Sequence, residues 1–266
     1  MALKIIVCAK QVPDTNVIKI NPKTGTLIRE GVPSILNNDD ANALEESLRI
    51  KDKYPDTHIT VVTMGPPQAT DLLLECLAMG ADEGVLISDR AVGGSDTWAT
   101  SNAIAAAVRK IGDFDLIFAG RQAIDGDTAQ VGPQLAEKVG IPQVTYVQKF
   151  DMADDMKTIT VERAMEDGHE VIEIQTPCML TAIKELNTPR YMSIHGIYGA
   201  KDKTVNVWNA ADVAVDLETV GLDASPTNVF RSFTPAPKGL GVIVEGDTEK
   251  EIADKLLIGL KGKHVI

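Results

Sequence analysis

The chain has 266 residues, 44% of them hydrophobic, and can therefore bury a substantial core as one large domain or as one domain with an appended arm. Its 26 basic and 38 acidic residues give a formal net charge of -12, which argues against a nucleic-acid partner, because a surface that follows phosphates needs clustered lysine and arginine. No apolar run approaches the roughly 20 residues that span a bilayer, and the first residues enter a strand instead of a charged leader, so we expect a cytoplasmic protein without membrane insertion.

Short apolar runs alternate with amphipathic segments between residues 4 and 139. The runs predict parallel strands that are covered on both faces. Apolar side chains at three- and four-residue spacing, such as Ile104, Val108 and Ile111, predict the helices between them. The alternation predicts an α/β fold with a doubly wound, mainly parallel sheet. The predicted strands are residues 4–9, 58–64, 84–87 and 116–119, and the predicted helices are about residues 39–53, 67–79, 96–111 and 128–139.

An insertion separates the first strand from the first helix. Residues 17–20 and 26–29 flank a turn-forming stretch that contains Asn21, Pro22 and Gly25, and they predict an inserted hairpin. This excursion leaves the tip of the first strand open.

The second half of the chain changes character at Gln143. Residues 143–182 are β-rich, and alternating side chains on both sides of Asp167-Gly168 predict two strands joined by a hairpin turn. A proline- and glycine-rich stretch follows, and then an amphipathic helix is expected at about residues 248–260. We expect residues 1–225 to form the α/β domain and residues 226–266 to form a C-terminal arm that packs on a partner.

Three segments are expected to meet at the carboxyl ends of the strands, where open α/β sheets bind ligands. They follow the first strand, open the first helix and follow the fourth strand. Small residues at Ala9 and Gly120 would let a ring or ribose approach the backbone, and Asp39, Asp125 and Asp127 could accept hydrogen bonds from hydroxyl groups. Thr128 could cap the next helix and leave the amides of residues 129–131 free for an anion. The alternative is that these polar residues are simply helix caps.

Several familiar signatures are missing from the sequence. The first strand is not followed by a Gly-x-Gly-x-x-Gly motif, and no Walker loop is present. Gly93-Gly94-Ser95-Asp96 reads as a turn in which Ser95 or Asp96 caps the following helix. The histidines and the three cysteines lack ligand spacing, so we predict neither a metal site nor catalytic side chains of the Ser-His-Asp kind.

Residues 161–172, with Arg163 before Asp167-Gly168, are followed at fixed spacing by Pro177-Cys178-Met179-Leu180-Thr181. Together they resemble the signature of electron transfer flavoprotein beta subunits. The resemblance extends from Val7-Cys8-Ala9-Lys10 through residues 78–82 and 122–127 to Asn187-Thr188-Pro189-Arg190-Tyr191. It implies the fold of the adenine-nucleotide-binding α/β hydrolase-like superfamily, and an alpha-subunit partner that holds an electron-carrying FAD.

The same resemblance implies that this chain holds an adenine nucleotide. Carried over position by position, the cofactor-binding residues would be Ala9, Asn37, Asn38, Asp39, Asp40, Met64, Gly120, Arg121, Gln122, Ala123, Ile124, Asp125, Gly126, Asp127, Thr128, Ala129, Gln130 and Val131.

The family has two branches that differ in this ligand. Conventional members hold AMP, whereas electron-bifurcating members hold a second FAD, with NADH as donor and with ferredoxin or flavodoxin and an acyl-CoA dehydrogenase as acceptors. Gln11-Val12-Pro13-Asp14-Thr15 resembles the bifurcating branch, because Thr15 leaves room where conventional members tend to have a tyrosine. The alternative is that Pro13 only turns the chain into the hairpin.

Arg121 is the candidate for a positive charge near the flavin ring or its phosphates, because a cation stabilises a reduced, anionic flavin. The alternative is a surface arginine that pairs with Asp125 or Asp127. A non-redox module resembling the universal stress proteins, or a scaffold with a structural ligand, is the competing function.

Residues 187–200 resemble the loop with which the family recognises its dehydrogenase. By position, Ile194 would be the exposed anchor on a mobile loop tip. The alternative is that Ile194 belongs to the core.

Overall fold

The computed structural model describes residues 2–14, 33–230, 238–239 and 241–266. The chain forms two compact units, and the first contains the described residues 2–14 and 33–230. The hairpin strands predicted at residues 17–20 and 26–29 lie outside the described residues.

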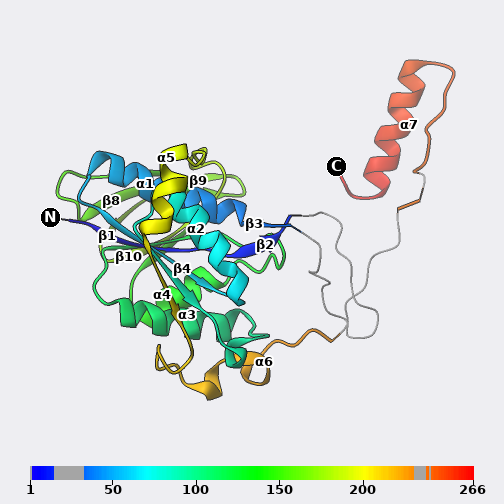
Figure 1. Cartoon of the computed structure of the whole chain (residues 1–266). Coiled ribbons are helices and arrows are strands. Elements are labelled where there is room, and N and C mark those ends of the chain that lie inside the picture. Colours follow the sequence, from blue (N-terminus) through cyan, green and yellow to red (C-terminus); the bar gives the residue numbers. More distant parts are fainter. Residues whose placement is uncertain (1, 15–32, 231–237, 240) are drawn as a thin grey trace. The chain divides into compact units, whose positions relative to one another are not determined.

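A nine-stranded sheet forms the centre of the first unit (Figure 1). The first seven strands in spatial order are mutually parallel, and the last two add to the sheet in antiparallel fashion. The predicted doubly wound, mainly parallel sheet is therefore confirmed. In spatial order the strands are β11 (Thr204–Trp208), β5 (Glu83–Ile87), β4 (His58–Met64), β1 (Lys4–Cys8), β6 (Leu116–Gly120), β10 (Cys178–Ala182), β7 (Gln143–Met152), β8 (Thr158–Met165) and β9 (Gly168–Gln175).

The strand order reverses between β1 and β6. From β1 the chain proceeds outward through β4 and β5 on one side, and β6 then begins the other side. The chain that leaves β1 leads to α1 on one face and the chain that leaves β6 leads to α4 on the other, so the carboxyl ends of these two strands are where open α/β sheets are expected to form a ligand crevice.

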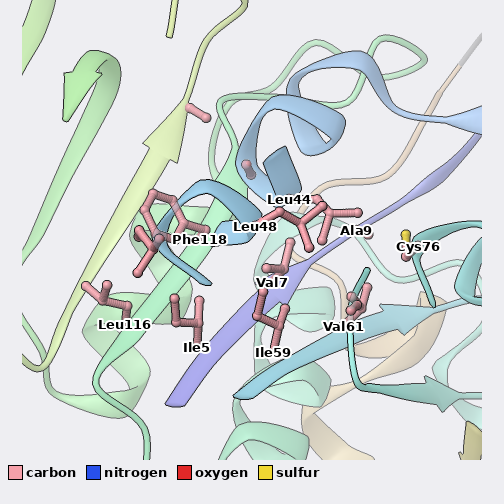
Figure 2. Packing of buried hydrophobic residues seen from close by; sticks show 14 of the residues in the cluster. Ile5, Val7, Ala9, Leu44, Leu48, Ile59, Val61, Cys76, Leu116 and Phe118 are labelled. Atoms are coloured by element: carbon pink, nitrogen blue, oxygen red, sulfur yellow. The ribbon is translucent and has the colours of Figure 1, made fainter. Parts of the chain in front are cut away.

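Helices cover both faces of the sheet (Figure 1). α1 (Asn38–Lys53) and α2 (Thr70–Met79) contribute Leu44, Leu48, Leu72, Leu73 and Leu77 to one buried cluster with β1, β4 and β6. Figure 2 shows Leu44 and Leu48 against Val7 in this cluster. α3 (Thr97–Ile111) and α4 (Val131–Val139) pack Ile104, Val108 and Leu135 on the opposite face. The apolar stripes that predicted the helices are the surfaces that they bury.

Two predicted helix starts differ from the structure. Residues 67–69 form a 3-10 turn, η1 (Pro67–Ala69), before α2 begins at Thr70. α4 begins at Val131, because Asp127 and Ala129 have left-handed φ angles of 49° and 53° that no right-handed helix accommodates. The predicted Thr128 cap is therefore wrong, whereas the Asp96 cap is confirmed by a 2.9 Å bond that its carboxylate accepts from the Ala99 N–H.

The predicted hairpin in the β-rich region is confirmed as β8 and β9. Met165 pairs with Gly168, so the loop residues are Glu166 and Asp167, and Gly168 begins β9 with φ 152°. A separate two-stranded ribbon, β2 (Gln11–Pro13) with β3 (Ser34–Leu36), leads away from β1 and back to α1.

The chain after β10 includes a short helix, α5 (Ile194–Gly199), where a mobile loop tip was predicted. The prediction was wrong because Ser193 caps this helix and α5 packs against α2. The turn η3 (Ala200–Asp202) leads into β11, and η4 (Leu217–Thr219) and α6 (Gly221–Ala224) follow β11.

The second unit contains α7 (Glu249–Gly262), which confirms the predicted C-terminal helix. The Thr248 hydroxyl accepts a 3.3 Å bond from the Glu251 N–H, and Lys255 pairs with Glu251 at 2.6 Å. Across the described ranges, no helix combines the length and the apolar character needed to cross a membrane.

Candidate functional site

Asp40, in the first turn of α1, joins the loops that leave β1 and β6. Its buried carboxylate accepts a 2.8 Å bond from the Lys10 N–H and a 2.9 Å bond from the Gly120 N–H. Burial raises the pKa of Asp40 to about 7, although both hydrogen bonds favour the charged form. Asp40 therefore braces the crevice between β1 and β6 from beneath, and its two oxygens are already engaged by the chain.

Asn37, immediately before α1, braces the same loop at a second point. Its amide donates 2.8 Å to the Gln122 carbonyl and accepts 3.0 Å from the Ile124 N–H. The side chain is fully buried. The sequence predicted Asn37 as a ligand contact, but its side chain instead holds the backbone of residues 122–124 in place. Asn38 is exposed at the start of α1.

The small residue at Gly120 serves the contact between α1 and β6. A Cβ at this position would lie 2.7 Å from the backbone carbon of Asp39 and from the backbone nitrogen of Asp40. The missing side chain of Gly120 therefore makes room for the backbone of α1, and not for a ring or ribose as the sequence predicted. Ala9 is likewise buried, and its N–H donates 2.9 Å to the Val62 carbonyl.

Arg121 and Asp39 form an ion contact on the crevice side of α1. Arg121 Nε lies 3.3 Å from Asp39 Oδ2, and the guanidinium lies 5.7 Å from the centre of the Tyr146 ring. The two contacting atoms are buried but misaligned, and neither has a hydrogen-bond partner within the described ranges. Burial raises the pKa of Asp39, while Arg121 opposes that rise. The predicted alternative pairing of Arg121 with Asp125 or Asp127 is wrong.

Those two acidic residues have other partners. Asp125 pairs with Lys10 Nζ at 2.6 Å, and Asp127 accepts a 2.8 Å bond from Gln122 Nε2. Gly126 between them is exposed, its φ is not left-handed, and a Cβ there would meet no chain atom within 4 Å. The backbone therefore does not require a glycine at position 126 for a positive φ; in this loop the left-handed residues are Asp127 and Ala129.

The stretch before α4 offers unused donors. For the backbone N–H groups of residues 128–131, the described part of the chain supplies no acceptor. The Gln130 side chain is held by the Thr97 hydroxyl at 2.7 Å, and Ala123 and Ile124 complete the loop above the Asn37 brace. A helix start with free amides attracts phosphate. Together with Arg121, whose side chain is 34% exposed, these donors fit the phosphates of a nucleotide.

Met64 ends β4, next to β1 at the same edge of the sheet, and is half-buried against the cluster beneath α3. Ile194 lies in α5 and not in the crevice. Sequence reasoning missed two side chains of the site: Lys10, which pairs with Asp125, and Tyr146, which faces Arg121. Lys10 lies in the segment that follows the first strand, but the sequence does not show that Asp125 is its partner. No motif in the sequence marks Tyr146 as a residue of the site.

The comparisons with known proteins decide the family. Residues 24–213 match the electron transfer flavoprotein domain. The chain is 56% identical over 264 residues to an electron transfer flavoprotein subunit beta of Clostridium acetobutylicum, covering 99% of this chain and 100% of the relative. The chain belongs to the electron transfer flavoprotein family, as a beta subunit. Membership implies that this beta subunit binds a flavin or a nucleotide.

Two further relatives of the beta subunit carry names that mention a reductase. The chain is 59% identical over 264 residues to the caffeyl-CoA reductase-Etf complex subunit CarD of Acetobacterium woodii, covering 99% of this chain and 100% of the relative. It is 48% identical over 272 residues to the acryloyl-CoA reductase electron transfer subunit gamma of Anaerotignum propionicum, again covering 99% and 100%.

Proposed function

We propose that this beta subunit binds FAD in the crevice between β1 and β6 and works in the cytoplasm as half of a heterodimer with an alpha subunit. NADH is the donor, and the electrons divide by flavin-based bifurcation between ferredoxin or flavodoxin and, through the alpha-subunit FAD, an acyl-CoA dehydrogenase. Similarity to subunits named for caffeyl-CoA and acryloyl-CoA reductase complexes supports the dehydrogenase branch.

The single observation that carries the proposal is the junction at α1. At the start of α1, Asn37 and Asp40 hold the loops that follow β1 and β6. Before α4, the N–H groups of residues 128–131 remain available within the described part of the chain. In this proposal those amides hold phosphate, and Asp39, Gln122 and Thr128 supply hydrogen bonds to ribose or ring atoms.

Bound FAD would supply chemistry that amino-acid side chains do not supply: acceptance of one hydride, which carries two electrons, and release of those electrons one at a time. The side chains of this subunit would contribute a positive charge near the cofactor and would fix the position of that charge. Arg121 places a cation at the crevice, and the Tyr146 ring and Asp39 hold that cation from two sides. The Arg121 side chain is 34% exposed, so a ligand phosphate or ring oxygen could reach its guanidinium group.

Counting the ligands of the purified heterodimer tests the proposal. We expect mass spectrometry of the released ligands to find two FAD per heterodimer, and we expect NADH to bleach the absorption of both near 450 nm. One FAD with one AMP would instead identify a conventional electron transfer flavoprotein. A colourless heterodimer that releases only AMP would identify a non-redox adenine-nucleotide module.

A further inference from the structure

An exposed group of apolar side chains lies on and before α5. Tyr191 is 98% exposed, Ile194 is 76% exposed and Tyr198 is 70% exposed. Ile194 and Tyr198 are four residues apart in α5 and therefore lie on one face of it. We call residues 191–198 the docking segment, because the family resemblance implies that Ile194 is the anchor for the dehydrogenase of the proposed function. Contacts before and beneath this segment fix its backbone to α1 and α2.

The first anchor precedes the docking segment and fixes it to α1. Arg190 Nε and Nη2 donate to the two oxygens of Glu45 at 2.8 and 3.0 Å, and the Arg190 N–H donates to the same carboxylate at 3.0 Å. Arg190 Nη2 also reaches Asp52 at 2.7 Å. Glu45 is buried and Arg190 is about one-third exposed, so the carboxylate end of this fork-like pairing is shielded from water.

Asn187 strengthens the same attachment. It donates 2.8 Å to Glu46 and exchanges bonds of 2.8 to 3.1 Å with Asn42. Asn42, Glu45 and Glu46 are buried polar residues on α1, and the two glutamates follow Asn42 by three and four residues. A helix that buries such a polar stripe has a specific partner for it, and that partner is the chain leading to the docking segment.

The second anchor lies under α5. A Cβ at Gly196 would collide with the Ala78 carbonyl oxygen at the end of α2, so glycine allows α5 to sit directly on α2. Beyond α5, Lys203 Nζ donates to the Leu77 and Ala81 carbonyls at 2.9 and 2.6 Å. Figure 1 shows α5 on the side of the sheet that α1 and α2 cover.

We propose that Arg190 and Gly196 are positioning residues that hold the docking segment in a preformed shape, so that the dehydrogenase meets ordered side chains instead of a loop that must be ordered on binding. The inference rests on the proposed function, since it takes the dehydrogenase as the occupant. Its physical basis is preorganisation: a surface that is already ordered loses less conformational entropy when it binds.

The test compares matched substitutions in the heterodimer. Arg190→Lys keeps the charge but loses the fork, and Arg109→Lys on α3 is its control, because Arg109 is exposed and donates to the Lys138 carbonyl instead of to any residue of the anchors. Gly196→Ala places a methyl group against Ala78, and Gly199→Ala in the same helix is its control, because a Cβ there meets nothing within 4 Å.

Two readouts separate positioning from general damage. Amide hydrogen exchange at Gly196 and Ile197, whose N–H groups bond to Ser193 at 2.9 Å, reports the order of α5. Dehydrogenase titration reports KM and kcat. We expect Arg190→Lys and Gly196→Ala to speed exchange and to raise KM roughly tenfold at unchanged kcat, with both controls like wild type.

Three outcomes would overturn the inference: faster exchange with unchanged KM, unchanged exchange and KM in both variants, or controls that raise KM equally. The Ile194→Ala variant distinguishes a failure of the positioning role from a failure of the proposed function. If Ile194→Ala raises KM and the positioning variants do not, only the positioning role fails. If Ile194→Ala leaves KM unchanged, the docking assignment itself fails.

Discussion

At the scale of single residues, the buried carboxylate of Asp40 links pH to stability. Its pKa in the folded chain is about 7, against an ordinary value of 3.8, because burial disfavours the charge. Between pH 4 and pH 7 the folded state therefore keeps a proton that the unfolded chain has lost. Stability from this group is greatest at the acidic end of the window and falls as the pH rises towards 7.

Replacing Asp40 with asparagine removes that titration. We expect Asp40→Asn to destabilise the protein more at pH 5 than at pH 8, because only wild type gains stability on acidification through this group. Urea unfolding of both proteins at the two pH values measures the difference. Parallel stability curves for wild type and variant would contradict the assignment.

Gly120 is a position at which the fold requires the absence of a side chain. Gly120→Ala would place a methyl group 2.7 Å from the backbone of residues 39 and 40, which cannot yield without moving α1. Overpacking of this kind costs about 1–3 kcal/mol, so we expect a lower free energy of unfolding by that amount. Gly126→Ala, with open space around it, is the control and should unfold like wild type.

A substitution at Gly126 tests ligand binding instead of folding. Because a larger side chain there meets no chain atom, we expect Gly126→Val to retain the wild-type free energy of unfolding within about 0.5 kcal/mol. We expect it to lower FAD occupancy, since the loop of residues 125–127 borders the crevice. Absorbance at 450 nm per heterodimer measures the occupancy, and unchanged flavin content would remove Gly126 from the site.

At the scale of elements, α5 decides how Ile194 is presented. The alternative that Ile194 is core is wrong, because its side chain is 76% exposed on a capped helix. Truncating a central interface anchor costs on the order of 2 kcal/mol, so we expect Ile194→Ala to raise the apparent KM for dehydrogenase about 30-fold. Flavin content and thermal unfolding serve as controls, and saturation at wild-type dehydrogenase concentrations would exclude Ile194 as the anchor.

At the scale of the whole molecule, we expect α7 to bind a partner. Ile252, Leu256 and Leu257 are between 37% and 49% exposed on it, more apolar surface than a helix usually leaves to water. We expect the alpha subunit to cover this face, and truncation after Pro235 to weaken the heterodimer. Size-exclusion chromatography at nanomolar concentration measures the loss, and undiminished co-elution would show that the arm contributes little to the interface.

Much of the architecture could be predicted because periodicity is a local signal. Apolar runs identified β1, β4, β5 and β6, and the Asp167-Gly168 dipeptide identified the β8–β9 hairpin. Positions of strand ends followed from the alternation of strands and helices, which is why the loops after β1 and β6 were expected to meet. The start of α4 could not be predicted in the same way, because the left-handed angles at Asp127 and Ala129 leave no mark in residue type.

The sequence by itself determined the family, the fold class and the three segments of the crevice. Only the tertiary structure decided what each polar side chain does there: Asp40 reaches Gly120 across 80 residues, Asn37 braces Ile124, and Arg121 contacts Asp39 rather than Asp125 or Asp127. The physical reason is the distance along the chain over which each kind of information acts. Pattern and propensity report the conformation of neighbouring residues, whereas a hydrogen bond or ion pair depends on distances of a few ångströms between segments that only the packed sheet brings together.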